Sequence, residues 1–312
     1  MNSRKEIIIL LWERQFVESE LKTLTYGSIE IRTVKNQKFI YTHYRDDGVP
    51  ITKYVGEYNE ELYNTILFNN DMAKQLKKRI KEINKKLKSL NYIDENLSYS
   101  VKLNIDFAKR NLVDTIYKQA ILEGISTTYP DTESILLSGK INNLTSEEVL
   151  KIVNLKHAWE FILNQNVILT NTDYYLLCEI NKFVEEGFYY SAGMIRSTPV
   201  KIGGTSWIPN IPIEGDVKED IKNILNSKKT YIDIAIELLL YVMKHQLFID
   251  GNKRTAVIFA NHYLISHSKG LIVIPDDLVE DFKKLLISYY EGKNAKEIKT
   301  FLKKNCYKSL FK

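Results

Sequence analysis

The stretch MKHQLFIDGNKRTAVIFANHYL, residues 243–264, places a short polar segment between two apolar runs of helical spacing. That polar segment is Asp250-Gly251-Asn252-Lys253-Arg254. A helix that begins near Asn252 presents unpaired N–H groups and a partial positive charge in its first turn. Gly251 lets the backbone approach a ligand closely, while Lys253 and Arg254 add cations. The segment therefore predicts an anion nest suited to phosphates, beside an Asp250 that could hold Mg²⁺.

A simpler interpretation of the same five residues is a capped helix start with solvated charges. Asp-Gly-Asn is common turn chemistry, because these residues tolerate left-handed backbone conformations and hydrogen-bond to their own backbone. The five residues alone leave both interpretations open.

The longer pattern QLFIDGNKRTA, residues 246–256, resembles the signature loop of the Fic (Fido) superfamily, which reads His-x-Phe-x-(Asp/Glu)-(Gly/Ala)-Asn-(Gly/Lys)-Arg. The Lys variant is similar to the Doc-type branch. GMIRSTPVKIGGTSWIPNIP, residues 193–212, resembles the stretch that precedes this signature, in which an Arg-containing segment leads into a β-hairpin flap and a Pro-rich segment follows. AILEGISTT, residues 120–128, resembles the inhibitory helix of self-regulating members. The resemblance covers roughly residues 105–290.

The resemblance implies a helical protein that binds ATP or another nucleoside triphosphate with Mg²⁺ and transfers AMP to a hydroxyl of a target protein. It implies that Asp250 holds the metal. The backbone of residues 251–253 and the Asn252 side chain would cradle phosphates, and Arg254 would bind a phosphate further along the nucleotide. A flap would clamp the protein substrate by strand pairing, which uses backbone groups. The flap residues are Ile202, Gly203, Gly204 and Thr205.

The match breaks at the catalytic position, where the signature has a histidine that acts as general base and this chain has Gln246. A carboxamide does not titrate near neutral pH and cannot take the proton. His245 is adjacent, but neighbouring helical residues point about 100° apart. We therefore consider His245 a weak candidate base, and a histidine at a helix end is the simpler interpretation.

The inhibitory segment departs from the family as well. Glu123-Gly124 is retained, but Gln119 stands where the motif has Ser or Thr, and Val257 stands where many relatives carry a second Arg. If Glu123 enters the site it occupies the γ-phosphate region and inhibits. Two alternatives remain open: an exposed acid at a helix end, or a carboxylate that positions water.

Three functions follow from these observations. The first is an AMP transferase that is weak or altered because Gln246 replaces the base. The second is a Fic-like pseudoenzyme that regulates by binding nucleotide or protein. The third is a phosphotransferase or a deAMPylase.

The remaining sequence predicts a mainly α-helical chain. Residues 28–56 alternate polar with β-branched or aromatic residues, which predicts an antiparallel β-meander, and residues 59–90 predict one long helix. Further helices are predicted at 105–123, 146–165, 172–186, 216–226, 230–246, 253–267, 276–290 and 294–303. These elements suggest an N-terminal segment, 1–104, and a Fic-like helical domain, 105–312. That domain would have a core at about 165–290 and an inhibitory-like helix at about 105–125.

Composition bears on the cellular location and the kinds of partner that we expect for this protein. The chain has 312 residues, a net charge of +5 and two cysteines. The cysteines are too few for a disulfide framework, and no apolar run reaches the ~18 residues of a membrane span. Trp12-Glu13-Arg14 interrupts the apolar start, which argues against a signal peptide. We expect a cytoplasmic protein without membrane or nucleic-acid partners, because the lysines are spread out and no aromatic platform is evident. Homo-oligomerisation stays possible.

Overall fold

The computed structural model describes residues 3–46, 48–139, 144–293 and 295–310. It divides into two compact units, Met1–Asp94 and Glu95–Lys312. The sequence-based boundary after residue 104 lies inside the first helix of the second unit. None of the helices in the described parts of the chain combines the length and apolar character needed to cross a bilayer.

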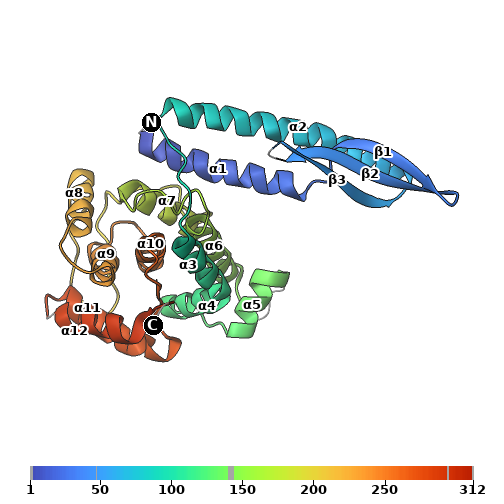
Figure 1. The fold of residues 1–312 in the computed structure, drawn as a ribbon. Coiled ribbons are helices and arrows are strands. Elements are labelled where there is room, and N and C mark those ends of the chain that lie inside the picture. Colours follow the sequence, from blue (N-terminus) through green and yellow to red (C-terminus); the bar gives the residue numbers. More distant parts are fainter. Residues whose placement is uncertain (1–2, 47, 140–143, 294, 311–312) are drawn as a thin grey trace. The chain divides into compact units, whose positions relative to one another are not determined.

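Unit 1 is a helix pair joined by a β-meander (Figure 1). Its elements are α1 (Ser3–Thr23), β1 (Ser28–Val34), β2 (Gln37–Asp46), β3 (Val49–Glu57) and α2 (Glu60–Ser89). Apolar residues of the two helices form a core that includes Ile7, Leu11, Ile83 and Leu87. The strands pair in the order β1-β2-β3, both pairs antiparallel. The meander and the long helix agree with the sequence-based prediction, whereas α1 was not predicted.

The turn between β1 and β2 explains the register of the first hairpin. Lys35 and Asn36 both have positive φ, 48° and 66°. Two successive residues with positive φ make the kind of two-residue turn that matches the twist of a hairpin. Val34 then pairs with Gln37, and the register continues to Ser28 opposite His43.

Unit 2 is helical and is arranged around α10 (Figure 1). Its first helices are α3 (Tyr99–Arg110), α4 (Leu112–Glu123), α5 (Tyr129–Ser138), α6 (Ser146–Ile162) and α7 (Tyr174–Val184). Next come α8 (Glu214–Leu225), α9 (Tyr231–His245), α10 (Asn252–Ser266), β4 (Leu271–Ile272) and η1 (Asp276–Leu278). The chain ends with α11 (Val279–Tyr290), α12 (Ala295–Phe301), η2 (Leu302–Cys306) and β5 (Tyr307–Lys308).

Helix α10 is the central helix of unit 2. Every residue from Arg254 to Ile265 is buried, and α3, α4, α6, α7 and α9 pack around it. A helix that is apolar and buried on all sides is held by its neighbours on every face. Its N-terminus, where the polar segment lies, is therefore held in a fixed position.

Two sequence-based predictions differ from the structure. The helix predicted over 105–123 is two helices, because the chain turns at Asn111 between α3 and α4. The predicted β-hairpin flap is wrong, since residues 200–212 contain no strand and form an extended segment with a turn at Gly203-Gly204. Pro209 and Pro212 lack the amide donors that a second strand needs. The predicted start at Asn294 lies outside the described residues.

Candidate functional site

The loop between α9 and α10 is closed by one side chain. The Asn252 Oδ1 accepts a hydrogen bond from the Phe248 amide at 2.9 Å, and Asn252 Nδ2 donates to the Phe248 carbonyl at 2.8 Å. The Phe248 ring is 1% exposed and anchors the loop in the core. Asn252 was predicted to cradle phosphates. Both of its polar side-chain atoms instead hold the loop, which leaves its backbone amide as the group available to a ligand.

The first turn of α10 presents free amides to a cavity. The first intrahelical hydrogen bond runs from the Thr255 amide to the Gly251 carbonyl at 2.8 Å. The amides of Asn252, Lys253 and Arg254 precede it and have no helical acceptor. The cavity has a volume of about 410 Å³ and is lined by Glu123, the segment 201–203, the signature loop and α11. The predicted anion nest therefore opens into a space that could hold phosphates.

Gly251 is required at its position for two reasons. Its φ of 73° is in the left-handed region, where residues with a Cβ are strained. A Cβ at this position would also overlap the carboxylate of Glu185 and crowd the Val184 side chain. The absence of a side chain thus lets the loop lie directly on the end of α7.

Arg254 lies beneath the loop and is surrounded by acids. Its side chain is 2% exposed, and its Nη2 lies 2.9 Å from Glu185 Oε1 and 3.5 Å from Asp250 Oδ2. Its Nε lies 3.6 Å from Glu123 Oε2. In the described part of the chain, Nε and Nη1 have no hydrogen-bond acceptor. Buried guanidinium nitrogens without acceptors are costly, so this residue fits an anionic ligand such as phosphate.

Glu185, at the end of α7, was not predicted as a site residue. Its side chain is 3% exposed. Burial, together with the nearby Asp250 and Glu123 carboxylates, outweighs the attraction of Arg254 and raises the pKa of Glu185 to about 7. An acid near a helix end is usually solvated, so a single sequence gives no signal for this residue.

Glu123 is the last residue of α4 and reaches the cavity. Its carboxylate lies 3.6 Å from both Lys253 Nζ and Arg254 Nε, and its side chain is 12% exposed. Gly124 ends the helix with a φ of 85°. Glu123 therefore stands where a negatively charged ligand of Lys253 and Arg254 would lie.

Gln119 fixes this helix against the site. Its Nε2 donates to the Arg254 carbonyl at 2.8 Å, and its Oε1 accepts from Trp159 Nε1 at 2.9 Å. Gln119 is 3% exposed. The residue that departs from the family motif is thus a buried anchor that joins α4 to α10 and α6.

Gln246 and His245 lie in different environments. Gln246 lines the cavity in a left-handed conformation, with its Nε2 donating to the Met243 carbonyl at 2.6 Å. Its Oε1 accepts from Asn252 Nδ2 at 3.2 Å. His245 is exposed and does not line the cavity; its Nδ1 lies 2.9 Å from the Tyr241 carbonyl and its ring packs on Tyr241. The imidazole therefore has no direct path to the anion nest.

The flap segment is fixed from below by Arg196. This side chain is 2% exposed, and it donates to the carbonyls of Thr198, Pro209, Asn210, His245 and Gln246. One guanidinium thereby ties the segment on both sides of the turn to the end of α9. These contacts give Arg196 an anchoring role.

The predicted flap residues border the site only in part. Ile202 and Gly203 line the cavity. Gly204 has a φ of 80° and faces Ile287 of α11, while the Thr205 hydroxyl donates to Glu291 at 3.2 Å. The segment thus rests on α11 and presents its backbone beside the cavity.

Asp250 is the residue that would hold Mg²⁺. Its Oδ1 accepts from the Gly251 amide at 2.7 Å, and its side chain is 46% exposed at the edge of the cavity. The described residues contain no group of three or more His, Cys, Asp or Glu that could hold a metal by itself. Magnesium commonly binds through one or two carboxylates together with substrate phosphates. A single accessible carboxylate beside an anion nest fits that pattern.

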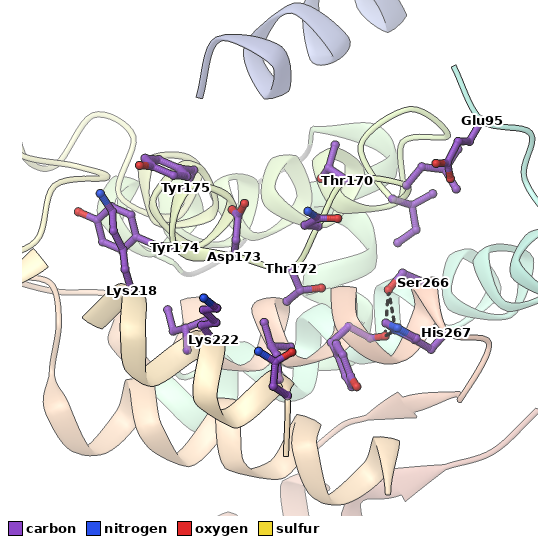
Figure 2. A pocket seen from close by; sticks show the side chains of 17 residues that line it. Glu95, Thr170, Thr172, Asp173, Tyr174, Tyr175, Lys218, Lys222, Ser266 and His267 are labelled. Carbon is purple, nitrogen blue, oxygen red and sulfur yellow. Dashed lines mark hydrogen bonds between the residues drawn. The ribbon is translucent and has the colours of Figure 1, made fainter. Parts of the chain in front are cut away.

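A second, larger cavity of about 680 Å³ lies at the other end of α10 (Figure 2). Ser266 and His267 border it, together with the start of α7 and part of α8. The α10 rise of ~1.5 Å per residue separates its two ends by roughly 21 Å. In Figure 2 the Lys218 side chain lies by Tyr174 and Tyr175, and its Nζ is 5.1 Å and 4.9 Å from the two ring centres. None of the predicted site residues lines this cavity.

Comparisons with known proteins agree with this geometry. Residues 171–264 match the Fic/DOC family. A search of curated proteins returns no match. Fic-1 from C. elegans superposes with a TM-score of 0.53 at 16% identity, over 78% of this chain and 76% of that one. A Fic domain containing signaling protein from Bacteroides thetaiotaomicron gives 0.50 at 18% identity, over 72% and 90%.

A Fic family protein from Desulfovibrio desulfuricans gives a TM-score of 0.51 at 13% identity, over 67% of this chain and 72% of that one. Identities this low show a shared fold and no more. The mainly helical, Fic-like fold class predicted from the sequence is thus confirmed.

Proposed function

We propose that this chain, which carries a Fic/DOC family domain at residues 171–264, binds Mg²⁺ and ATP at the start of α10 and transfers AMP to a hydroxyl of a target protein. One observation carries the proposal. The first residues of α10, Asn252 and Lys253, line a cavity of about 410 Å³ with amides that have no helical acceptor, and the buried Arg254 follows them directly. Amides at a helix start and a guanidinium without acceptors are groups that bind phosphates.

Each residue of the nest has a distinct task. The α10 amides hold phosphate oxygens, Lys253 screens their charge from the cavity side, and Arg254 binds a phosphate from beneath the loop. Asp250 would hold Mg²⁺, which when bound neutralises phosphate charge and orients the triphosphate. The target hydroxyl oxygen bonds to the α-phosphorus as the bond to the β-phosphate oxygen breaks, so pyrophosphate leaves.

The proton of the attacking hydroxyl is the weak point of this chemistry. Gln246 occupies the position of the base, and its amide cannot accept a proton near neutral pH. The proton must pass to solvent water. General base catalysis contributes about 10²–10⁴-fold, so transfer by this chain should be slower by that order than with a histidine. Positioning and electrostatic stabilisation by the nest remain.

Glu123 restrains the site in this proposal. Its carboxylate sits 3.6 Å from Lys253 and Arg254, so a phosphate that binds these cations has to displace it. Gln119 holds α4 firmly on α10. The restraint is therefore a rigid one, and it opposes the productive placement of the triphosphate.

The target protein would bind along the segment of Ile202, Gly203, Gly204 and Thr205. Two of these residues, Ile202 and Gly203, line the cavity, and their backbone groups are not paired in a strand. An extended peptide of the target could add to this backbone and bring its hydroxyl over the nest.

A second candidate function is a nucleotide- or protein-binding regulator without transfer. The observation that favours it is the Gln246 side chain, which is already held by Met243 and Asn252. Phosphotransfer and deAMPylation are further reactions of the same site. A γ-label on the target identifies phosphotransfer, whereas deAMPylation is identified by loss of an α-label from a target that was AMPylated beforehand.

The test is to incubate the purified chain with Mg²⁺ and ATP labelled at the α- or the γ-phosphate, together with a lysate as a source of targets. Transfer of the α-label supports AMP transfer, and transfer of the γ-label shows phosphorylation instead. Calorimetric binding of ATP without either transfer supports the regulator. Absence of ATP binding, also in a Glu123→Gly variant, contradicts the whole proposal. Arg254→Met serves as the matched binding control.

A further inference from the structure

The β-meander and α2 of unit 1 enclose a groove of about 1060 Å³ that is basic and contains two tyrosine rings. Its cations are Arg45, Lys74, Lys77, Lys78 and Lys81. Asp71 is the one acid among the described residues that line it. Among the described residues, the ion pairs of α2 are made by Arg79 with Glu13 and Glu82, and none involves these four lysines. The groove thus has an excess of positive charge that the acids of the described residues do not neutralise.

The two tyrosines come from distant positions and are brought together by the fold. Tyr26 precedes β1 and Tyr44 lies on β2, and their ring centres are 5.2 Å apart. The Lys77 Nζ lies 4.5 Å from the centre of the Tyr26 ring. The groove therefore combines cations with an aromatic surface, which is the combination that binds single-stranded nucleic acid.

The wall of the groove is built to hold this arrangement. The Asn70 side chain makes two hydrogen bonds to Gly27. Its Oδ1 accepts from the Gly27 amide at 2.7 Å, and its Nδ2 donates to the Gly27 carbonyl at 3.1 Å. Asn69 donates to the Thr25 carbonyl at 3.0 Å. Gly27 lies so close to His43 that a Cβ would be 2.6 Å from the His43 carbonyl oxygen. These contacts fix Tyr26 between the sheet and the lysines of α2.

The basic surface continues along α2 beyond the groove. Residues 74–88 contain eight Lys and Arg against one acid, Glu82. Lys74, Lys78, Lys81, Lys85 and Lys88 are spaced by four and three residues, so they share one helix face, and all five are exposed. This stripe is roughly 21 Å long at ~1.5 Å per residue. A row of cations of this length could contact several phosphates of a single strand.

We propose that the groove between the β-meander and α2 binds single-stranded nucleic acid, with the Lys stripe on the phosphates and Tyr26 and Tyr44 on the bases. This assignment is independent of the proposed nucleotide site, which lies in the other unit. It reverses the expectation of no nucleic-acid partner, which rested on the apparent lack of an aromatic platform. A lipid surface fits less well, because the groove offers tyrosine rings rather than aliphatic side chains that would insert into a bilayer.

The test is fluorescence anisotropy of the full chain with a labelled oligothymidylate of ~20 nucleotides, longer than the ~4–16 nucleotides of common single-strand sites. The expected result is binding that is tighter than to a duplex of equal length. The Lys74→Glu, Lys78→Glu, Lys81→Glu variant should bind at least about tenfold more weakly. It should also lower the slope of log K against log salt by about 2, since each phosphate contact contributes about 0.7.

A charge-matched control separates the groove from net charge. Lys102, Lys109 and Lys304 are exposed lysines of unit 2, and their replacement by Glu changes the total charge equally. This control should keep both affinity and salt slope. Tyr44→Ala should weaken binding about tenfold, whereas Tyr44→Phe, which retains the ring, should not. Circular dichroism melting confirms that each variant is folded.

Three outcomes overturn the proposal. The first is an equal loss of binding in the groove variant and in the unit 2 control. The second is equal affinity for single strand and duplex with no effect of Tyr44→Ala. The third is the absence of oligonucleotide binding by the wild-type chain; Lys-dependent binding to phosphatidylcholine vesicles that contain phosphatidylserine would then identify a lipid surface as the ligand.

Discussion

The Glu185 carboxylate lies 2.9 Å from the Arg254 guanidinium, directly beneath the loop that carries Gly251. Both side chains are almost completely buried, at 3% and 2% exposure. Glu123 and Asp250 add two more carboxylates around the same guanidinium. The Arg254 guanidinium therefore faces three acids, only one of which, Glu123, also pairs with Lys253, and this balance of charge governs how the site responds to pH and to phosphate.

The first prediction concerns the pH dependence of stability. Because the pKa of Glu185 is raised to about 7 from an ordinary value of 4.5, the folded chain holds a proton that the unfolded chain releases. The free energy of unfolding therefore falls as the pH rises from about 4.5 to about 7, by up to about 3 kcal/mol. The contribution is measured by denaturant unfolding, as the free energy of unfolding of the wild type minus that of Glu185→Gln at each pH.

The comparison uses Glu133→Gln, an exposed acid on α5, as a control that should follow the wild type at each pH. A wild-type minus Glu185→Gln difference that stays constant across the window would show that the pKa of Glu185 is the same in the folded and unfolded chains, and would contradict the prediction.

The second prediction concerns Gly251. Replacement by Ala places a Cβ in a strained backbone conformation and against the Glu185 carboxylate, so the free energy of unfolding should fall by about 2–4 kcal/mol. Gly139→Ala is the matched control, since Gly139 has a φ of 67° but no atom within 4 Å of the added carbon. That variant should lose only the ~1–2 kcal/mol of backbone strain. If both variants lose the same free energy of unfolding, the whole loss in Gly251→Ala comes from backbone strain and the contact with Glu185 adds nothing.

The third prediction concerns Gln246→His. The imidazole restores a group that titrates near neutral pH at the cavity wall, so AMP transfer should rise by about 10²–10⁴-fold. The rate is measured as α-label transferred from ATP. Gln246→Ala, which removes the contact with Asn252 without adding a base, should show no rise. If Gln246→His transfers no α-label, even when combined with Glu123→Gly, this result contradicts AMP transfer.

The fourth prediction concerns Glu123→Gln. The amide keeps the shape of the side chain but removes the charge that competes for Lys253 and Arg254. ATP affinity measured by calorimetry should increase by about tenfold, the equivalent of ~1.4 kcal/mol. Replacement of Asp114, which pairs with Lys118 elsewhere on α4, should leave affinity unchanged. Unchanged affinity in Glu123→Gln would mean that the carboxylate does not occupy a phosphate position.

Much of the site was visible in the sequence because its groups are consecutive. The α10 amides, Lys253 and Arg254 follow one another, and helix physics places them together without long-range contacts. Glu185 was missed because an acid near a helix end is usually solvated. Only the packing of α7 under Gly251 buries it. The hairpin flap predicted near residues 202–205 is absent for two reasons. Pro209 and Pro212 lack the amide donors of a second strand, and Arg196 binds the carbonyls of Pro209 and Asn210, a contact that spacing cannot reveal.

The sequence by itself determined most elements of this protein: the meander from its alternation, most helices from their periodicity, and the polar start of α10 from an Asp-Gly-Asn-Lys-Arg run between two apolar runs. Tertiary structure decided which of these elements meet. It set three carboxylates around Arg254, aimed His245 away from the cavity, and joined Tyr26 to Tyr44 above the lysines of α2. Local patterns follow from the dihedral angles of neighbouring residues, whereas charge balance and burial depend on residues that are distant in the chain.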